Sequence, residues 1–362
     1  MTERRITLST PIRDSARVAK IVGAIDKPNL RVVETVLQFE EPPSLDEKWR
    51  LGLIVGASGS GKTSVARALY PGAFYEPVPW DPDRAVVDAF EPRPFRELET
   101  ALVAVGFATR TSWLRPYRTL SGGERFRCDL CKALLDSLGE IVVFDEFASL
   151  VDATIAKTAS IAVRKALDRG TFPKRLVALA HRRDVVEPLE PDWLLDADSG
   201  KLTRGRLRRP RIELDVREAN RALWPKFAPH HYLSGALNPA ARSFVATLGD
   251  RPVAFAAILQ SEGRRGRKRV HRLVVAPEFQ GIGIGGALLD ALAEIVADEG
   301  SKLEIVVGAG PLVARLTRAP NWRLVKASPV GRAQRHKGES AKGSFGRAIV
   351  SFIYLGNNAK ST

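Results

Sequence analysis

A glycine-rich octapeptide in the first quarter of the chain has the residue types and spacing of a phosphate-binding loop. The segment 56–63 has the sequence GASGSGKT, follows an apolar run and precedes a helix-like stretch. Glycines allow backbone amides to approach and cradle the phosphates of a nucleotide at the start of a helix. Lys62 would bind the β- and γ-phosphates, and the hydroxyl of Thr63 would bind Mg²⁺. The residues predicted to bind ATP here are Gly56, Ser58, Gly59, Ser60, Gly61, Lys62 and Thr63.

Two adjacent acidic residues end a second apolar run. The run 141–144 is followed directly by Asp145 and Glu146. Because the apolar run predicts a buried strand, both carboxylates emerge at its end, where Asp145 would hold Mg²⁺ through water and Glu146 would polarise the attacking water. His181 follows a further apolar run, 175–180, and is a candidate contact to the γ-phosphate. A solitary histidine at a strand end is more often structural, so its predicted role depends on the order of the surrounding motifs.

The segment 120–124, LSGGE, resembles the signature of the ABC-type ATPases. The segment 149–152, SLVD, resembles the D-loop of the same family, and His181 then has the position of the switch histidine. In this family the signature of one subunit completes the nucleotide site of another, which implies a head-to-tail homodimer. The residues that the resemblance places at the γ-phosphate of a partner are Ser121, Gly122 and Gly123.

Two departures separate the chain from the ABC transporters. The spacing from Lys62 to Leu120 is well short of the transporter pattern, and no glutamine lies between them. The missing residue is the glutamine that couples transporters to their membrane domains. Asp81 and Asp83, beside Trp80, are the candidates to replace it. The chain is therefore more similar to the soluble ABC ATPases of nucleic-acid metabolism.

The segment 274–289, VVAPEFQGIGIGGALL, joins a strand end to a glycine-rich turn and an amphipathic stretch. Such a turn presents backbone amides to phosphate at a helix start. The pattern resembles the acetyl-CoA loop of the GNAT acetyltransferases, which binds the CoA pyrophosphate, while the free edge of the preceding strand holds the pantetheine arm. A dinucleotide-binding loop is the alternative, although no βαβ unit precedes it. The resemblance assigns to acetyl-CoA the residues Val274, Val275, Gln280, Gly281, Gly283, Gly285 and Gly286.

Three residues are candidates for acid/base work on the acceptor. Transfer of an acyl group to an amine requires a base that removes a proton. His271 lies in the predicted strand before the CoA loop, where GNAT enzymes often place a base. His231 and Tyr232 lie upstream, in the region that faces the acceptor in that family, and histidine titrates near neutral pH. A purely structural role is the alternative for each of the three residues.

The excess of positive charge is concentrated in the second part of the chain. The 362 residues include 56 Lys and Arg against 41 Asp and Glu, a net charge of +15. Residues 207–362 hold 25 of these basic and 12 of these acidic side chains, which leaves +13. Two basic stretches, 264–269 and 332–342, are suited to grip phosphates. The charge favours an anionic partner, which could be nucleic acid, an acidic protein or the phosphates of CoA.

The order of apolar and polar runs indicates two α/β domains. Residues 1–206 alternate strand-like and helical stretches, which predicts a P-loop ABC-type nucleotide-binding domain with a mostly parallel sheet. Residues 207–362 contain a strand at 211–216, a hairpin at 243–259 and a helix at 285–300, which predicts a GNAT α+β domain with a mixed sheet. No apolar run is long enough to span a membrane and the first residues lack a signal-peptide core, so we expect a cytoplasmic protein.

The whole chain resembles the ABC–GNAT fusion proteins of phages and mobile elements. The second half is also similar to the phage Mu Mom type of DNA-modification protein, through the pair His231–Tyr232 and its basic character. The resemblance implies an ATP-hydrolysing, acyl-CoA-dependent acyltransferase that modifies an amine of nucleic acid, with DNA favoured over RNA. ATP, Mg²⁺ and acetyl-CoA or another acyl-CoA would take part. The alternatives are an ATP-gated protein or small-molecule N-acetyltransferase, and an ABC-type switch whose GNAT domain senses acyl-CoA.

Overall fold

The chain packs as two units in the computed structural model, which describes residues 3–25, 30–206, 212–231, 236–308, 310–328 and 349–356. The first unit comprises 1–78, 132–153 and 167–209, and the second comprises 79–131, 154–166 and 210–362. The signature-like segment 120–124 therefore packs with the C-terminal residues, as do residues 154–166. The division of the motifs at residue 206 stays a prediction. Among the described residues, no helix is long and apolar enough to cross a membrane.

The first unit is built on a five-stranded sheet in the order β4-β5-β3-β6-β7. Its strands are β3 (Leu51–Val55), β4 (Ile141–Phe144), β5 (Arg175–Ala180), β6 (Trp193–Asp196) and β7 (Lys201–Arg204). The first four are parallel, and β7 pairs antiparallel with β6. The central strands consist of apolar residues that are almost fully buried, as expected where both faces of a parallel sheet are covered. The strand predictions for residues 51–56, 141–146 and 175–180 are confirmed.

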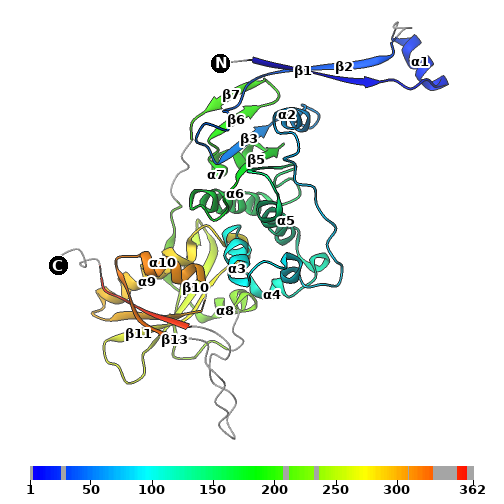
Figure 1. The fold of residues 1–362 in the computed structure, drawn as a ribbon. Helices are drawn as coiled ribbons and strands as arrows, with labels where there is room; N and C mark the ends of the chain where they lie inside the picture. Colours follow the sequence, from blue (N-terminus) through cyan, green and yellow to red (C-terminus); the bar gives the residue numbers. More distant parts are fainter. Residues whose placement is uncertain are drawn as a thin grey trace. The chain divides into compact units, whose positions relative to one another are not determined.

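A two-stranded ribbon precedes this sheet and was not anticipated from the sequence. Strands β1 (Glu3–Pro11) and β2 (Val32–Glu40) pair antiparallel along their whole length, and helix α1 (Ala16–Ala24) lies at the end of the ribbon (Figure 1). Most of its side chains are exposed, including Val33 and Ile21.

Three of the described α-helices have 15 or 16 residues, and the others are shorter. Helices α2 (Lys62–Leu69) and α7 (Val186–Leu189) belong to the first unit, and α3 (Phe95–Ala104), α4 (Arg110–Trp113), α8 (Trp224–Phe227), α9 (Ile284–Asp298) and α10 (Gly310–Arg318) belong to the second. Helix α5 (Gly122–Asp136) begins in the second unit and ends in the first, and helix α6 (Ala153–Asp168) belongs to the second unit except at its two ends.

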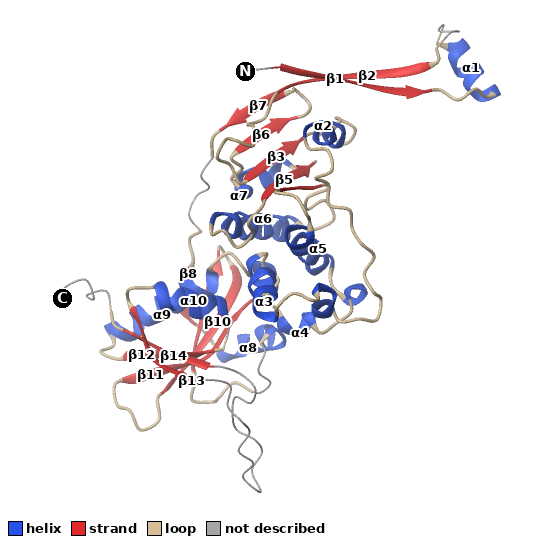
Figure 2. Cartoon of the chain, viewed as in Figure 1, coloured by secondary structure: helices blue, strands red, loops and turns tan. Residues whose placement is uncertain are grey.

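The second unit contains a seven-stranded mixed sheet in the order β13-β14-β12-β11-β10-β9-β8. Its strands are β8 (Asp215–Glu218), β9 (Arg242–Leu248), β10 (Arg251–Gln260), β11 (Arg267–Val275), β12 (Lys302–Val307), β13 (Trp322–Ser328) and β14 (Ile349–Tyr354). Figure 2 shows α9 and α10 beside these strands. The core of this unit also contains Ile161 and Ala162 of α6. The predicted hairpin turns at Gly249, and the predicted helix 285–300 ends before Gly300, which has a φ of 72°.

Strands β11 and β12 are parallel but pair only at one end. The paired residues are Arg267–Arg269 with Lys302–Glu304, although β11 continues to Val275. The two strands therefore separate toward their carboxyl ends, where β11 has a free edge. This separation confirms the strand geometry that the CoA loop pattern implied.

Candidate functional site

The phosphate-binding loop lies between β3 and α2, as the sequence predicted. Gly61 begins the helix with a φ of 86°, a left-handed conformation that only glycine adopts without strain. A Cβ at Gly61 would lie 2.5 Å from Leu37 Cδ1. Lys62 is 8% exposed, and its ammonium donates to the carbonyls of Gly56 at 2.9 Å and Ala57 at 2.7 Å. The lysine head therefore lies within the loop that would receive the phosphates.

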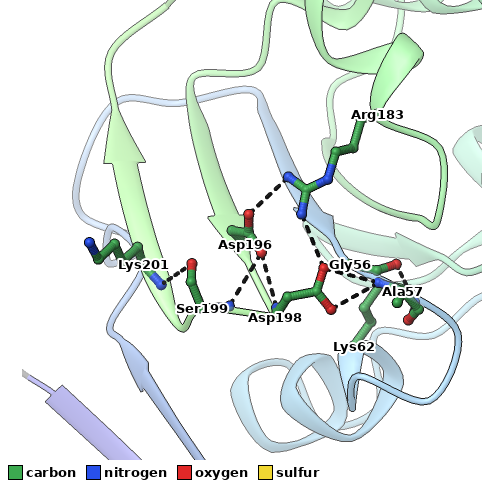
Figure 3. Close-up of polar contacts among 8 residues, drawn as sticks. All are labelled: Gly56, Ala57, Lys62, Arg183, Asp196, Asp198, Ser199 and Lys201. Atoms are coloured by element: carbon green, nitrogen blue, oxygen red, sulfur yellow. Dashed lines mark hydrogen bonds and ion pairs between the residues drawn. The ribbon is translucent and has the colours of Figure 1, made fainter.

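A carboxylate from the turn after β6 contacts the same loop (Figure 3). The backbone amide of Ala57 donates to both oxygens of Asp198, at 3.0 and 3.2 Å. Arg183 in turn donates to Asp196 at 2.8 Å and to Asp198 at 3.0 Å. The hydrogen bond from Arg183 holds the pKa of Asp196 below its ordinary value. Sequence reasoning missed this support, although two aspartates directly follow the apolar residues of β6.

The proposed magnesium ligands lie close together. The hydroxyl of Thr63 donates to Asp145 Oδ2 at 2.9 Å, so the helix start and the end of β4 meet there. A hydroxyl and a carboxylate are oxygen ligands of the kind that Mg²⁺ prefers, usually with several waters retained. No cluster of three or more His, Cys, Asp or Glu side chains suited to a metal occurs among the described residues. The pair fits an Mg²⁺ ion that is also held by nucleotide phosphates.

Glu146 and His181 lie together although 35 positions separate them in the chain. His181 Nδ1 lies 3.6 Å from Glu146 Oε2, and it lies 3.2 Å from the hydroxyl of Ser149, which also donates to Glu146. Glu146 has a φ of 53° and Ala148 one of 59°. A left-handed backbone is unfavourable for residues with a Cβ, and strained backbones of this kind cluster at functional sites. The geometry assembles an acid, a hydroxyl and an imidazole at the end of a central strand.

The signature segment begins helix α5 with a reciprocal cap. Glu124 accepts from the amide and the hydroxyl of Ser121, both at 2.9 Å, and the amide of Glu124 lies 3.3 Å from the same hydroxyl. This S-x-x-E arrangement is a capping box, which satisfies amides at the helix start. Burial raises the pKa of Glu124, but hydrogen bonds from Ser112 and Ser121 outweigh it and lower the pKa overall. Ser121 and Gly122 are exposed, whereas Gly123 packs on Ile155.

The two candidates for the missing glutamine have local partners. Asp81 accepts from the amide of Asp83 at 3.0 Å, and Asp83 pairs with Arg118 at 3.1 Å. Trp80 stacks on Tyr117, with ring centroids 4.7 Å apart, and donates to Asp129. These contacts shape the turn before the signature, and the replacement of the glutamine stays a prediction.

The predicted CoA loop connects β11 to α9. Gly283 begins the helix with a φ of 101° and is an exposed residue. Gly281 has a φ of 82°. A Cβ at Gly285 would lie 3.2 Å from Val275 Cγ2, and one at Gly286 would lie 2.5 Å from Arg315 Nε. Glycine at position 285 lets the helix start pack closely on the end of the strand, and glycine at position 286 leaves room for Arg315 of α10.

The side chain of Gln280 has protein partners on both ends. Its oxygen accepts from the amide of Ala108 at 3.0 Å, and its nitrogen donates to the carbonyl of Val275 at 3.1 Å. Val274 is buried and Val275 is partly buried at the free end of β11. Gln280 therefore fixes the loop, and its predicted contact with acetyl-CoA stays a prediction.

Two histidines come together on the acceptor side. His271 lies on β11, where its Nε2 accepts from the amide of Asn238 at 3.4 Å. Burial, together with the charges of Arg272, Arg269 and His231, lowers the pKa of His271 to about 4. The imidazole is therefore neutral at pH 7. The ring of His231 lies edge-on to Trp224, with centroids 5.9 Å apart. Tyr232, the third candidate, lies outside the described residues.

The basic hairpin before β11 is rich in ion pairs. Arg264 and Arg267 pair with Glu304 at 3.4 and 2.5 Å, and Arg269 pairs with Glu262 at 3.3 Å. Lys268 pairs with Glu299. Exposed pairs of this kind are worth about 0–1 kcal/mol, so a phosphate could replace the acidic partners. The second basic stretch, 332–342, lies outside the described residues.

Comparisons with known proteins found one family model and several solved structures that are similar to parts of the chain. A model of the acetyltransferase (GNAT) family matches residues 209–311. No curated protein sequence matches the chain. An IAA acetyltransferase from Bacillus cereus is 18% identical over 39% of this chain and 99% of its own, with a TM-score of 0.30. A Bacillus subtilis acetyltransferase in complex with CoA is 18% identical over 39% and 98%, with a TM-score of 0.29.

A third solved structure corresponds to the other half of the chain. It is an ATP-binding cassette solved as a dimer with ADP and Pi, 15% identical over 49% of this chain and 94% of its own, with a TM-score of 0.35. The first unit combines a mostly parallel sheet with the loop 56–63 and the acids after β4. Residues 209–311 match the model of the acetyltransferase (GNAT) family.

Proposed function

We propose that the protein is an ATP-hydrolysing, acyl-CoA-dependent acyltransferase that modifies an amine of nucleic acid, with DNA favoured over RNA. The observation that carries the acyltransferase proposal is the free edge of β11 beside the exposed helix start at Gly283. Backbone groups along such an edge can hold the pantetheine arm, and the amides at the helix start can bind the pyrophosphate.

The ATPase proposal rests on side chains that come together from separate segments. Lys62 would turn from the loop carbonyls to the phosphates, and Thr63 with Asp145 would hold Mg²⁺. Glu146 would polarise the attacking water, and His181, which lies beside it, would contact the γ-phosphate. Ser121, Gly122 and Gly123 would complete the site of a partner subunit in a head-to-tail homodimer.

The acyl transfer step requires an acyl-CoA donor, an acceptor amine and a base. In this proposal the amine nitrogen attacks the thioester carbonyl and the carbon–sulfur bond breaks. The neutral His271, or His231 beside it, accepts the proton of the attacking amine and passes it to the thiolate, so that CoA leaves as the thiol. Nucleic acid is favoured as the acceptor by the net charge of +13 on residues 207–362. An exocyclic amine of a base is reached most easily when the base leaves the stack.

One observation favours the alternative of a protein or small-molecule acceptor. The cations of the hairpin 264–269 pair with Glu304, Glu262 and Glu299, which reduces the charge that they offer to phosphates. The two proposals differ in their response to added polymers.

The test is ATP hydrolysis with duplex DNA, single-stranded DNA and tRNA, followed by transfer from labelled acetyl-CoA to whichever polymer stimulates hydrolysis. Glu146→Gln is the control, because it removes the general base but keeps the shape of the side chain. We expect stimulation by DNA and label in the DNA. Intact basal hydrolysis with neither stimulation nor labelling of any polymer would exclude the nucleic-acid acceptor.

A further inference from the structure

The CoA loop contains no positive charge of its own. No Lys or Arg occurs in residues 276–289, whereas Glu278 adds a negative charge beside the loop. A pyrophosphate carries two negative charges, and a phosphate site usually combines amides with a cation. The cation must therefore come from another part of the fold.

Helix α5, which begins at the signature motif, contributes the first basic residue. Arg127 is 2% exposed, and it donates to the carbonyls of Pro277 at 3.1 Å and Glu278 at 3.2 Å. It also donates to the hydroxyl of Thr158 on α6, at 3.1 Å. The planar guanidinium holds two consecutive carbonyls in fixed directions. The two peptide units immediately before the loop are thus fixed by the ATPase signature helix.

The loop also packs backbone to backbone on the ATPase segment. A Cβ at Gly281 would lie 2.8 Å from the Cα of Gly106 and 2.9 Å from the Cβ of Ala162. A Cβ at Gly106 would lie 3.0 Å from the carbonyl oxygen of Gln280. Both glycines have positive φ angles. Because no side chain fits between them, the conformation of the CoA loop depends on residues 106–108 and on α6.

Helix α6 contributes the second basic residue, at the position where the pyrophosphate is expected. The ammonium of Lys165 donates to the carbonyl of Ile282. Its Nζ would lie 3.3 Å from a Cβ placed on Gly283, the exposed residue that begins α9. Lys165 is partly exposed. A cation and a helix start therefore lie side by side at the loop.

We propose that the ATPase helices complete the acyl-CoA site, with Lys165 as a contact to the CoA pyrophosphate and Arg127 as the residue that positions the loop. The proposal rests on acyl-CoA binding, which is part of the proposed function. It adds that the binding site includes residues of α5 and α6, outside the segment 209–311 that the family model matches.

The test for Lys165 is equilibrium binding of CoA, dephospho-CoA and pantetheine to the full chain, with pantetheine measured by competition. Dephospho-CoA keeps the pyrophosphate, and pantetheine has no phosphate. We expect Lys165→Met to weaken CoA and dephospho-CoA equally, by about tenfold, because a charge-assisted contact is lost. Pantetheine should bind unchanged, and Lys165→Arg should restore most of the affinity. Lys157→Met, an exposed change on the same helix, is the matched control.

Three outcomes would overturn the Lys165 contact. They are unchanged CoA binding in Lys165→Met, an equal loss for pantetheine, and a loss for CoA but not for dephospho-CoA, which would assign the lysine to the 3′-phosphate. If the wild-type chain binds no CoA at all, the proposed function fails as well, so the two failures are distinguishable.

Arg127 needs a test that a general loss of folding does not imitate. Arg127→Lys keeps a charge but not the planar fork, and it should increase amide hydrogen exchange within residues 277–283. Exchange in β9 and β10 should stay as in the wild type, while the KM for acetyl-CoA rises and kcat changes less. Unchanged exchange in the loop together with an unchanged KM would remove Arg127 from this role.

Discussion

The protein contains two glycine-rich loops that are both predicted to bind phosphate groups, and the two loops differ in where their positive charge comes from. Each follows a strand and begins a helix at a glycine with positive φ, 86° at Gly61 and 101° at Gly283. The loop 56–63 contains its own cation, Lys62, whereas the loop 280–286 has none, and Arg127 and Lys165 contact it from other helices. The first loop therefore has its cation within a local segment, whereas the cations that contact the second loop come from more than 100 positions away.

The largest expected effect tests whether the first loop is self-sufficient. Lys62→Ala should reduce ATP hydrolysis by about 100-fold or more, because the charge that stabilises the transferred phosphate is lost. CoA affinity should not change, because Lys62 contacts only its own loop in the described contacts. Phosphate release and calorimetric CoA binding measure the two effects, with the exposed Lys48→Ala as control. A parallel loss of CoA affinity would break the contrast between the loops.

The next largest effect tests the close contact between Gly106 and the loop 280–286. Gly106→Ala and Gly263→Ala both place a Cβ on a left-handed backbone, which costs about 1–2 kcal/mol. Only the first also meets a neighbour, the carbonyl of Gln280 at 3.0 Å, whereas Gly263 has nothing within 4 Å. We expect Gly106→Ala to weaken CoA binding and to lower the unfolding midpoint more than Gly263→Ala does. Equal CoA affinities and equal unfolding midpoints for the two variants would show that the close contact at Gly106 does not affect CoA binding or stability.

A smaller effect tests the support of the first loop by Asp198. Asp198→Ala removes the acceptor of the Ala57 amide and should weaken ATP binding severalfold, because the loop loses a hydrogen bond that holds its backbone. Asp198→Asn keeps an acceptor oxygen and should retain more affinity. Nucleotide titrations in a Glu146→Gln background avoid turnover. Identical affinities for the Ala and Asn variants would contradict the role of the hydrogen bond.

The smallest effect concerns the titration of His271. Its pKa of about 4 lies below the ordinary value of 6.5, so the unfolded chain takes up a proton that the folded chain does not. Stability from this site is therefore present above about pH 6.5 and is lost as pH falls toward 4. NMR of labelled histidines should place the midpoint near pH 4, and Arg272→Gln should raise it, whereas the exposed Arg217→Gln should not. A midpoint near 6.5 in the wild type would refute the shift.

The sequence was sufficient to predict features formed by residues that are close together in the chain. It did not indicate contacts between residues that are far apart in the chain. The loop 56–63, the strand and acids at 141–146 and the helix after Gly283 each depend on neighbours in the chain, so periodicity and glycine spacing were sufficient. The ribbon β1–β2 pairs residues up to 37 positions apart, such as Glu3 with Glu40, and its strands are largely exposed. Their pairing joins residues far apart in the chain, which the sequence pattern does not indicate.

The candidate sites show the same limit. Glu146 and His181 could be linked because known motifs occur in order, and the structure places them 3.6 Å apart. Nothing in the residues around Arg127 or Gly106 indicates a contact with positions 277–281, because a tertiary contact between distant backbones leaves no spacing to detect. Gln280 illustrates the reverse case, since its pattern predicted a ligand contact but did not indicate the hydrogen bonds of its side chain with Ala108 and Val275.

The presence of Ile161 and Ala162 in the core of the second unit has a consequence for synthesis on the ribosome. Residues 154–166 leave the ribosome before the strands and helix that cover them, which extend to about residue 307. At about 5–20 residues per second, this part of the helix waits several seconds or longer for its partners. A nascent chain paused at residue 209 should therefore be cut by protease within α6 more readily than the released chain.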